Sequence, residues 1–166
     1  MKKVLITRPL PDVVVAEARK YFDVTVRSET SPLSKSEMRT ALGAFDGIMP
    51  TLGDMFQPAV FDSLSESKCT ILANFGVGYN HIDVDAALQR GVTVSNTPGA
   101  VTDATADIAM TLMLMSARRA GEGERLVRSG KWEGWHPTQM LGLHLSGKTV
   151  GIVGMGRIGQ AIAQRC

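Results

Sequence analysis

The chain has 166 residues, a net charge of +2, 44% hydrophobic residues and 20% charged residues. This balance is typical of about one globular domain, or of one domain and part of another. The small charge excludes a strongly basic nucleic-acid binder. The two cysteines, Cys69 and Cys166, make no disulfide framework, and the most apolar stretch, 108–117, is too short to span a bilayer. We therefore expect a cytoplasmic protein that binds neither nucleic acid nor membrane.

Short β-type runs alternate with helical patterns over the first 98 residues. Ser34 followed by Glu37 is a capping-box pattern that marks the start of a helix. Strands are predicted at 4–6, 24–26, 48–49, 69–73 and 92–94, and helices at 12–22, from Ser34 onward, at 58–64 and at 83–90. This alternation predicts βαβ units, and five such strands predict an α/β domain with a flavodoxin-like parallel sheet.

The pattern changes after residues 97–99, where a Thr-Pro-Gly sequence breaks the alternation. A long apolar helix is predicted over 102–119, with Thr102 or Asp103 as its cap. The middle of this helix has little polar face, so it must be covered nearly all round, as in a helix between domains or in a subunit interface. The segment 121–147 holds both tryptophans, which either pack on their own domain or belong to an arm that embraces a second subunit.

A predicted buried strand at 148–153 leads directly into Gly154, Gly156 and Gly159, and a helical pattern follows. Strand, glycine turn and helix are the context that a GxGxxG dinucleotide-binding motif requires. The first glycine permits the tight turn, the second lets the backbone approach a pyrophosphate, and the third lets helix and strand pack closely. The sequence therefore predicts the start of a Rossmann NAD(P)-binding domain, with a ligand-free structural turn as the alternative. The acidic residue that would indicate a preference for NAD or NADP is expected beyond Cys166.

A second glycine pair, Gly76 and Gly78, lies between the fourth predicted strand and a helix. Either its backbone N–H groups hold a carboxylate or phosphate, or the glycines serve a tight turn. His81 is interpreted as a residue that flanks the next helix, and His136 and His144 as surface or packing residues. The three histidines have no metal-ligand spacing with one another or with the cysteines, so no metal site is predicted.

Five segments are distinctive in their order and spacing, namely 74–83, 94–99, 102–107, 147–151 and 154–159. Together they resemble the D-isomer-specific 2-hydroxyacid dehydrogenases. Within that family, the segment 102–107 with Arg118-Arg119 and Trp135–Pro137 is most similar to the glyoxylate and hydroxypyruvate reductases. The resemblance implies reduction of a small 2-oxo acid to a D-2-hydroxy acid, with NAD or NADP as the cofactor and a homodimer as the assembly.

The resemblance also implies a division of the chain and a set of site residues. Residues 1–98 are expected to be the N-terminal portion of the substrate domain. Residues 99–166 are expected to hold the crossover helix, the dimerisation arm and the first βα unit of an incomplete NAD(P)-binding domain. The implied substrate-binding residues are Leu52, Val77 and Gly78, and the implied cofactor-binding residues are Thr105, Gly154, Gly156, Arg157, Ile158 and Gly159.

The family's catalytic arginine, glutamate and histidine lie well beyond the GxGxxG loop, so none is expected within these residues. General acid catalysis accompanies the hydride transfer in such a reduction. We therefore expect the parent protein to be the enzyme and the 166-residue chain alone to be inactive. The alternatives are a non-catalytic, nucleotide-responsive binding protein of the same fold, and an inactive truncated fragment.

Overall fold

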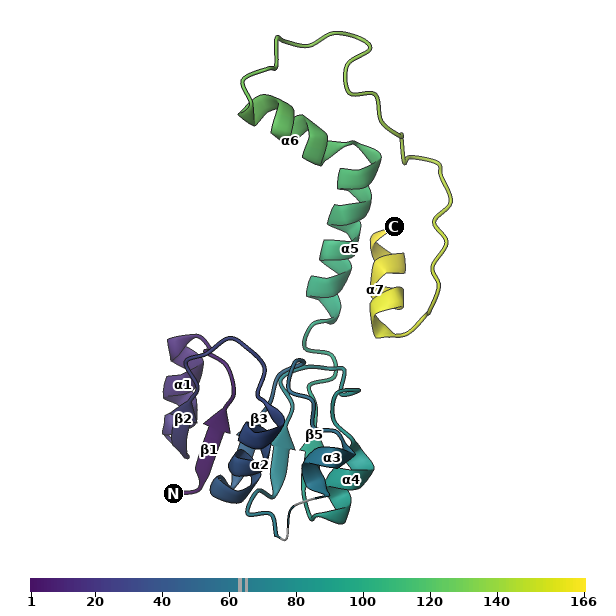
Figure 1. Ribbon diagram of the computed structural model, residues 1–166. Helices are drawn as coiled ribbons and strands as arrows, with labels where there is room; N and C mark the ends of the chain where they lie inside the picture. Colours follow the sequence, from purple (N-terminus) through teal and green to yellow (C-terminus); the bar gives the residue numbers. More distant parts are fainter. Residues whose placement is uncertain (63, 65) are drawn as a thin grey trace. The chain divides into compact units, whose positions relative to one another are not determined.

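The computed structural model describes residues 1–62, 64 and 66–166. The chain divides into two compact units, Met1–Ala100 and Val101–Cys166, and Figure 1 labels their helices and all of their strands except β4. Among the described residues, no helix combines the length and the apolar character that a membrane crossing requires.

The first unit is built on a five-stranded, all-parallel sheet with the strand order β2-β1-β3-β4-β5 (Figure 1). Its strands are β1 (Lys3–Ile6), β2 (Asp23–Val26), β3 (Gly47–Met49), β4 (Ile71–Ala73) and β5 (Thr93–Ser95). This order is that of the flavodoxin-like doubly wound sheet, so the fold predicted for this part of the chain is confirmed. Because all strands run the same way, their carboxyl ends meet at one edge of the sheet.

The helices of this unit are α1 (Asp12–Arg19), α2 (Lys35–Ala44), α3 (Pro58–Phe61) and α4 (Val84–Gln89). The predicted capping box of α2 is confirmed, because the Glu37 N–H donates to Ser34 Oγ at 3.3 Å and the Ser34 N–H donates to the Glu37 carboxylate at 2.7 Å. The prediction over 12–22 was too long, because the chain turns after α1 to enter β2. The helix predicted over 58–64 is present only as α3, and residue 63 of that range lies outside the described residues.

An apolar cluster packs helices α2, α3 and α4 against the sheet of the first unit, whereas Val15, the buried residue of α1, lies outside it. The fully buried side chains of the cluster include Leu42, Ile48, Phe56, Phe61, Leu72 and Val92. Burial of this much apolar surface is the main stabilising contribution to such a domain. The cluster fixes the strands, and the loops at their carboxyl ends are therefore presented from a rigid base.

The second unit contains α5 (Thr102–Ala117), α6 (Ala120–Arg128) and α7 (Arg157–Arg165), and α5 packs against both other helices. The long helix predicted here is confirmed, but neither Thr102 nor Asp103 caps it. The N-cap is Val101, which offers no side-chain hydrogen bond. Asp103 lies one residue inside the helix and accepts from Arg165 Nη2 at 3.0 Å, while Asp107 accepts from Arg165 Nε at 2.6 Å.

Helix α6 was not predicted, because Gly121 and Gly123 obscure its helical pattern. The helix is amphipathic and contains Glu124 and Arg128, which are one turn apart and form an ion pair at 2.8 Å. Just before it, Arg119 takes the left-handed conformation with φ 55°, and its guanidinium binds Glu122 at 2.6 Å. Exposed pairs of this kind contribute little individually, and α6 contains no buried residue.

The strand predicted at 148–153 is absent, and this prediction was wrong. Its residues form neither helix nor strand, and Val153 is fully exposed at 105%. A strand needs a neighbour to pair its backbone N–H and C=O groups. No strand is found among the described residues of the second unit, all of 101–166, so this segment has nothing to pair with.

Two leucines, one buried and one exposed, allow the contribution of the core to stability to be compared with that of the surface. Leu72 on β4 is completely buried, whereas Leu88 on α4 is 65% exposed. We expect Leu72→Ala to lower the free energy of unfolding by about 2–5 kcal/mol, because it leaves a cavity in the apolar core. The matched variant Leu88→Ala should change it by less than about 0.5 kcal/mol. Urea denaturation followed by circular dichroism measures both, and equal losses would contradict the placement of the core.

Candidate functional site

The carboxyl edge of the sheet carries four buried polar residues, Thr7, Asp54, Asn74 and His81. Thr7 directly follows β1, and Asn74 directly follows β4. Buried polar groups are costly unless they are hydrogen-bonded. In open α/β sheets, ligands bind outside the carboxyl ends of the strands. The candidate site therefore lies at this edge.

Asn74 organises the loop of residues 76–78, which we call the Gly76 loop. Its Nδ2 donates to the carbonyl of Gly76 at 3.1 Å and to that of Gly78 at 3.0 Å. A second amide, Asn96 Nδ2, donates to the carbonyl of Val77 at 2.8 Å. All three carbonyls of the loop are thus bound by protein groups.

The carbonyl bonds determine where the N–H groups of the Gly76 loop point. A trans peptide is planar, so its N–H points opposite to its C=O. The N–H of Val77 shares a peptide with the Gly76 carbonyl, and the N–H of Gly78 shares one with the Val77 carbonyl. Within the described part of the chain, neither N–H donates to a protein acceptor. Two successive N–H groups without a protein acceptor are the kind of donors that a carboxylate can use.

The Gly76 loop borders a surface hollow of about 390 Å³. Its lining residues are Leu52, Met55, Gly78, Asn80 and His81, and we call it the Leu52 hollow. Two of the predicted substrate residues, Leu52 and Gly78, therefore line the same space, and Val77 is adjacent to Gly78 in the loop. Apolar Leu52 and Met55 beside free N–H groups suit a small anion with a short apolar portion.

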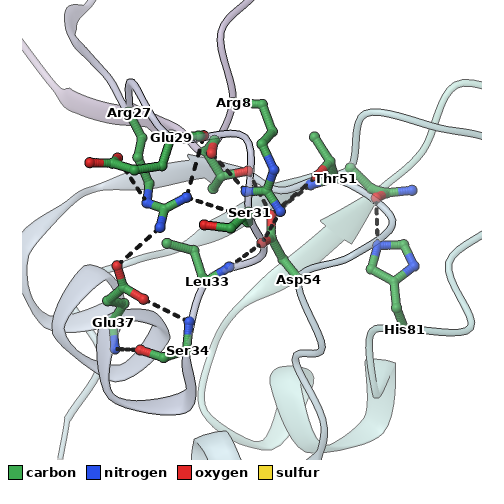
Figure 2. A network of polar contacts seen from close by, with 12 residues as sticks. Arg8, Arg27, Glu29, Ser31, Leu33, Ser34, Glu37, Thr51, Asp54 and His81 are labelled. Atoms are coloured by element: carbon green, nitrogen blue, oxygen red, sulfur yellow. Dashed lines mark hydrogen bonds and ion pairs between the residues drawn. The ribbon is translucent and has the colours of Figure 1, made fainter.

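The loop that carries Leu52 is held by Asp54, whose side chain is completely buried (Figure 2). Its carboxylate accepts from Thr7 Oγ1 at 2.6 Å and from Arg8 Nη2 at 3.0 Å. Two backbone N–H groups also donate to it, from Leu33 at 2.9 Å and from Thr51 at 3.0 Å. One carboxylate thus joins the segments that follow β1, β2 and β3.

These donors keep Asp54 ionised. Burial by itself raises the pKa of Asp54, but the N–H groups of Leu33 and Thr51, with the Thr7 hydroxyl and Arg8, outweigh it and hold the pKa below the ordinary value of 3.8. The negative charge is fully matched by donors within the protein. It does not compete for the N–H groups of the Gly76 loop.

His81 is bonded to Asn74, with 3.0 Å between His81 Nε2 and Asn74 Oδ1 (Figure 2). Because Asn74 uses its amide nitrogen as a donor, Oδ1 is the acceptor and His81 Nε2 carries the proton. Burial lowers the pKa of His81, although the charge of Asp54 acts to raise it. The imidazole is therefore neutral at physiological pH.

Sequence analysis missed Asp54 and Asn74 as site residues and interpreted His81 only as a residue beside a helix. No local motif marks Asp54, because most of its partners come from two other segments, those that follow β1 and β2. The available signal was the pairing of Asn74 and His81, two hydrogen-bonding residues on either side of a glycine loop. His136 and His144 are exposed, in accord with their interpretation. No cluster with the composition of a metal site occurs among the described residues.

The predicted cofactor residues lie in the second unit, where residues 154–159 form the Gly154 loop. Gly154 has φ +96°, a conformation that favours glycine. A Cβ on Gly159 would overlap the Gly154 carbonyl oxygen, whereas a Cβ on Gly156 would meet nothing within 4 Å. Gly156 is the N-cap of α7 and gives it no side-chain cap, so the first-turn N–H groups of Arg157 and Ile158 are left for another acceptor. The remaining predicted residue, Thr105, is exposed on α5.

Residues 4–164 match the family described as D-isomer specific 2-hydroxyacid dehydrogenase, catalytic domain. The chain is 44% identical to a glycerate dehydrogenase of Hyphomicrobium methylovorum, over 99% of the chain and 51% of that protein. It is 41% identical to a glyoxylate reductase of Pyrococcus horikoshii, over 98% of the chain and 49% of that protein. The chain thus spans about half the length of the relatives it matches.

A solved structure extends the similarity to three dimensions. It is an NADPH-dependent glyoxylate/hydroxypyruvate reductase from Sinorhizobium meliloti in complex with NADP and malonate. The TM-score is 0.77 at 32% sequence identity, and the match covers 99% of the chain and 49% of that structure.

The Asp54 network leads to a prediction about acid stability. We expect Asp54→Asn to lower the free energy of unfolding at neutral pH by roughly 2–4 kcal/mol, because it breaks the bond to Arg8 and presents an amide donor to other donors. The folded-state pKa of Asp54 lies below the ordinary value of 3.8, so the stability that its charge supplies is present above that pH and is lost as the pH falls through the depressed pKa.

The difference in the free energy of unfolding between the wild type and Asp54→Asn should therefore become smaller as the pH is lowered toward about 3. Urea denaturation across this range measures it, and the exposed Asp23→Asn serves as the control. A gap that stays constant with pH would show that the charge of Asp54 does not hold these loops.

Proposed function

The chain belongs to the D-isomer specific 2-hydroxyacid dehydrogenase family, and on this premise we propose that the whole protein reduces a small 2-oxo acid to a D-2-hydroxy acid with NADH or NADPH. The observation that carries the proposal is the pair of free N–H groups of Val77 and Gly78 beside the Leu52 hollow. They suit the carboxylate that every 2-oxo acid presents next to its reactive carbonyl.

The size and the lining of the Leu52 hollow favour a substrate of the glyoxylate or hydroxypyruvate type. The glyoxylate reductase and glycerate dehydrogenase relatives support this class. The Sinorhizobium meliloti reductase was solved with malonate, which is a small carboxylate. Leu52 and Met55 offer an apolar wall, and Asn80 offers a polar side chain for a hydroxyl group.

The Gly154 loop fits a dinucleotide. The space at Gly156 lets a pyrophosphate approach the backbone, and the first turn of α7 presents the N–H groups of Arg157 and Ile158 to its negative charge. Thr105 is proposed for the nicotinamide end. When bound, the reduced nicotinamide supplies the hydride.

Within this scheme the described residues bind and orient, and none is assigned as the general acid. The N–H groups of Val77 and Gly78 hold the carboxylate, which fixes the position of the adjacent carbonyl carbon. Leu52 excludes water from one side of the substrate. We place the catalytic arginine, glutamate and histidine outside residues 1–166, because the family resemblance assigns them to the part of the relatives that the chain does not span.

We also propose a homodimer in which the second unit supplies the contact surface. That unit exposes several large apolar side chains, among them Ile108 and Leu112 at 60% each, Leu143 at 69% and Trp135 at 79%. Exposed apolar groups in such number mark an interaction surface. Aromatic residues such as Trp135 are enriched in interfaces between subunits.

The proposed activity is tested on the protein expressed from its whole reading frame. We expect oxidation of NADH or NADPH, followed by the absorbance of the reduced nicotinamide, with glyoxylate or hydroxypyruvate. Glycolaldehyde is the control, because it matches glyoxylate in size but has no carboxylate. Its kcat/KM should be lower by at least about a hundredfold, since the two N–H groups are left unpaired. Absence of turnover with both oxo acids, or equal turnover of glycolaldehyde, would refute the proposal.

Two glycine variants test the cofactor site separately. Gly156→Ala should leave thermal stability unchanged, because its Cβ meets nothing, yet weaken NADPH binding at least about tenfold by standing where the pyrophosphate approaches. Gly159→Ala should destabilise the second unit by about 1–3 kcal/mol, because its Cβ overlaps the Gly154 carbonyl. Thermal denaturation and fluorescence titration with NADPH distinguish the two. Unaltered NADPH binding by Gly156→Ala would argue against the assignment.

A further inference from the structure

We propose that Asn74 and His81 are positioning residues, which hold the Gly76 loop so that its free N–H groups face the substrate carboxylate. This inference rests on the proposed function, because it concerns the same anion site. Neither side chain is proposed to take part in the hydride transfer.

The first support is the complete use of the Asn74 side chain. Asn74 is 2% exposed, and its Nδ2 donates to the carbonyls of Gly76 and Gly78 at 3.1 and 3.0 Å. Its Oδ1 accepts from His81 Nε2 at 3.0 Å. The backbone N–H of Asn74 also donates to Ser95 on β5 at 2.9 Å. The amide is thereby fixed in orientation from the sheet on one side and from His81 on the other.

The second support is the flexibility of the loop that Asn74 binds. Gly76 and Gly78 have no side chains to restrict their backbone angles, so the peptides between them are free to rotate unless they are tethered. Asn74 binds both ends of this short segment. Rotation of either peptide would turn an N–H away from the ligand and cost a charge-assisted hydrogen bond.

The third support is the place of His81. It lies seven positions after Asn74, beyond the loop, and is 6% exposed. It also lines the Leu52 hollow together with Gly78. A neutral imidazole with Nε2 protonated supplies one donor directed at Asn74 Oδ1, and this prevents the amide from flipping. An amide flipped the other way would present its oxygen to the loop carbonyls and would repel them.

The test compares variants of the full-length protein, isotopically labelled at the valine and glycine nitrogens, during titration with malonate. In the wild type, the amide resonances of Val77 and Gly78 should shift and saturate. His81→Leu and Asn74→Leu should each weaken malonate binding about tenfold, the factor expected for one lost hydrogen bond. His81→Gln should restore most of the affinity, because its side-chain amide is able to donate to Asn74.

Two controls separate positioning from stability. Ser67→Ala removes a hydroxyl that donates to the Cys69 carbonyl at 2.9 Å, near the opposite edge of the sheet, and should leave malonate binding unchanged. The double variant Asn74→Leu/His81→Leu leaves no buried imidazole without its partner, so it should be more stable than Asn74→Leu while still binding malonate weakly. It preserves the test if a single variant fails to fold.

Kinetics distinguish this inference from the proposed function. The KM for glyoxylate should rise about tenfold in His81→Leu, whereas the KM for NADPH should not change. Malonate affinities of both leucine variants equal to that of the wild type would overturn the positioning role, even if turnover is normal. A wild type that binds malonate as expected but reduces no oxo acid would refute only the proposed function. A wild type whose Val77 and Gly78 resonances do not respond to malonate would refute the anion site and, with it, the positioning role.

Discussion

The buried carboxylate of Asp54 is the constraint on which the site depends. The apolar core fixes the five strands, but it does not determine the paths of the loops that leave their carboxyl ends. Asp54 joins three of those loops through Thr7, Leu33 and Thr51, with Arg8 as the balancing charge. A buried ion of this kind is weak evidence for stability in itself, because its desolvation offsets much of its attraction. Its role here is to hold the loop that carries Leu52 in position.

Asn74 performs the equivalent function for the other wall of the Leu52 hollow. The Asp54 carboxylate accepts hydrogen bonds from N–H donors, and the Asn74 amide donates hydrogen bonds to carbonyl acceptors. The two buried side chains therefore hold their loops through opposite kinds of hydrogen bond. The result is a surface on which protein carbonyls are already bonded while the N–H groups of Val77 and Gly78 are not. The carboxylate of Asp54 near this edge does not oppose the proposed anion site, because its charge is matched by its own donors.

The sequence was sufficient to predict those elements whose structure is determined by nearby residues. The five strands, the capping box at Ser34 and the long helix α5 follow from periodicity and short-range hydrogen bonds, and all were predicted. Helix α6 was missed because glycines at 121 and 123 weaken its pattern. Asp54 could not be assigned, because Thr7, Arg8 and Leu33 are distant from it in the chain and only folding brings them together. His81 is only seven positions from Asn74, but no short-range pattern shows that the two side chains bond across the glycine loop. The assignments of Val77, Gly78, Thr105, Arg157 and Ile158 came from family resemblance, those of the three glycines of the Gly154 loop came first from the GxGxxG motif, and all remain predictions.

In the Gly154 loop and the segment before it, some structural features depend on residues close in the chain and others require residues far away. The close contact between Gly159 and the Gly154 carbonyl and the start of α7 at Arg157 involve residues only a few positions apart, so they form within this chain. The segment 148–153 just before them has the composition of a buried strand, yet it does not become one. Strand structure requires hydrogen bonds from a neighbouring strand, whereas a glycine turn and a helix start satisfy their own backbone groups. The glycine turn and the helix start of this motif are therefore encoded locally, whereas a strand before them depends on a partner strand.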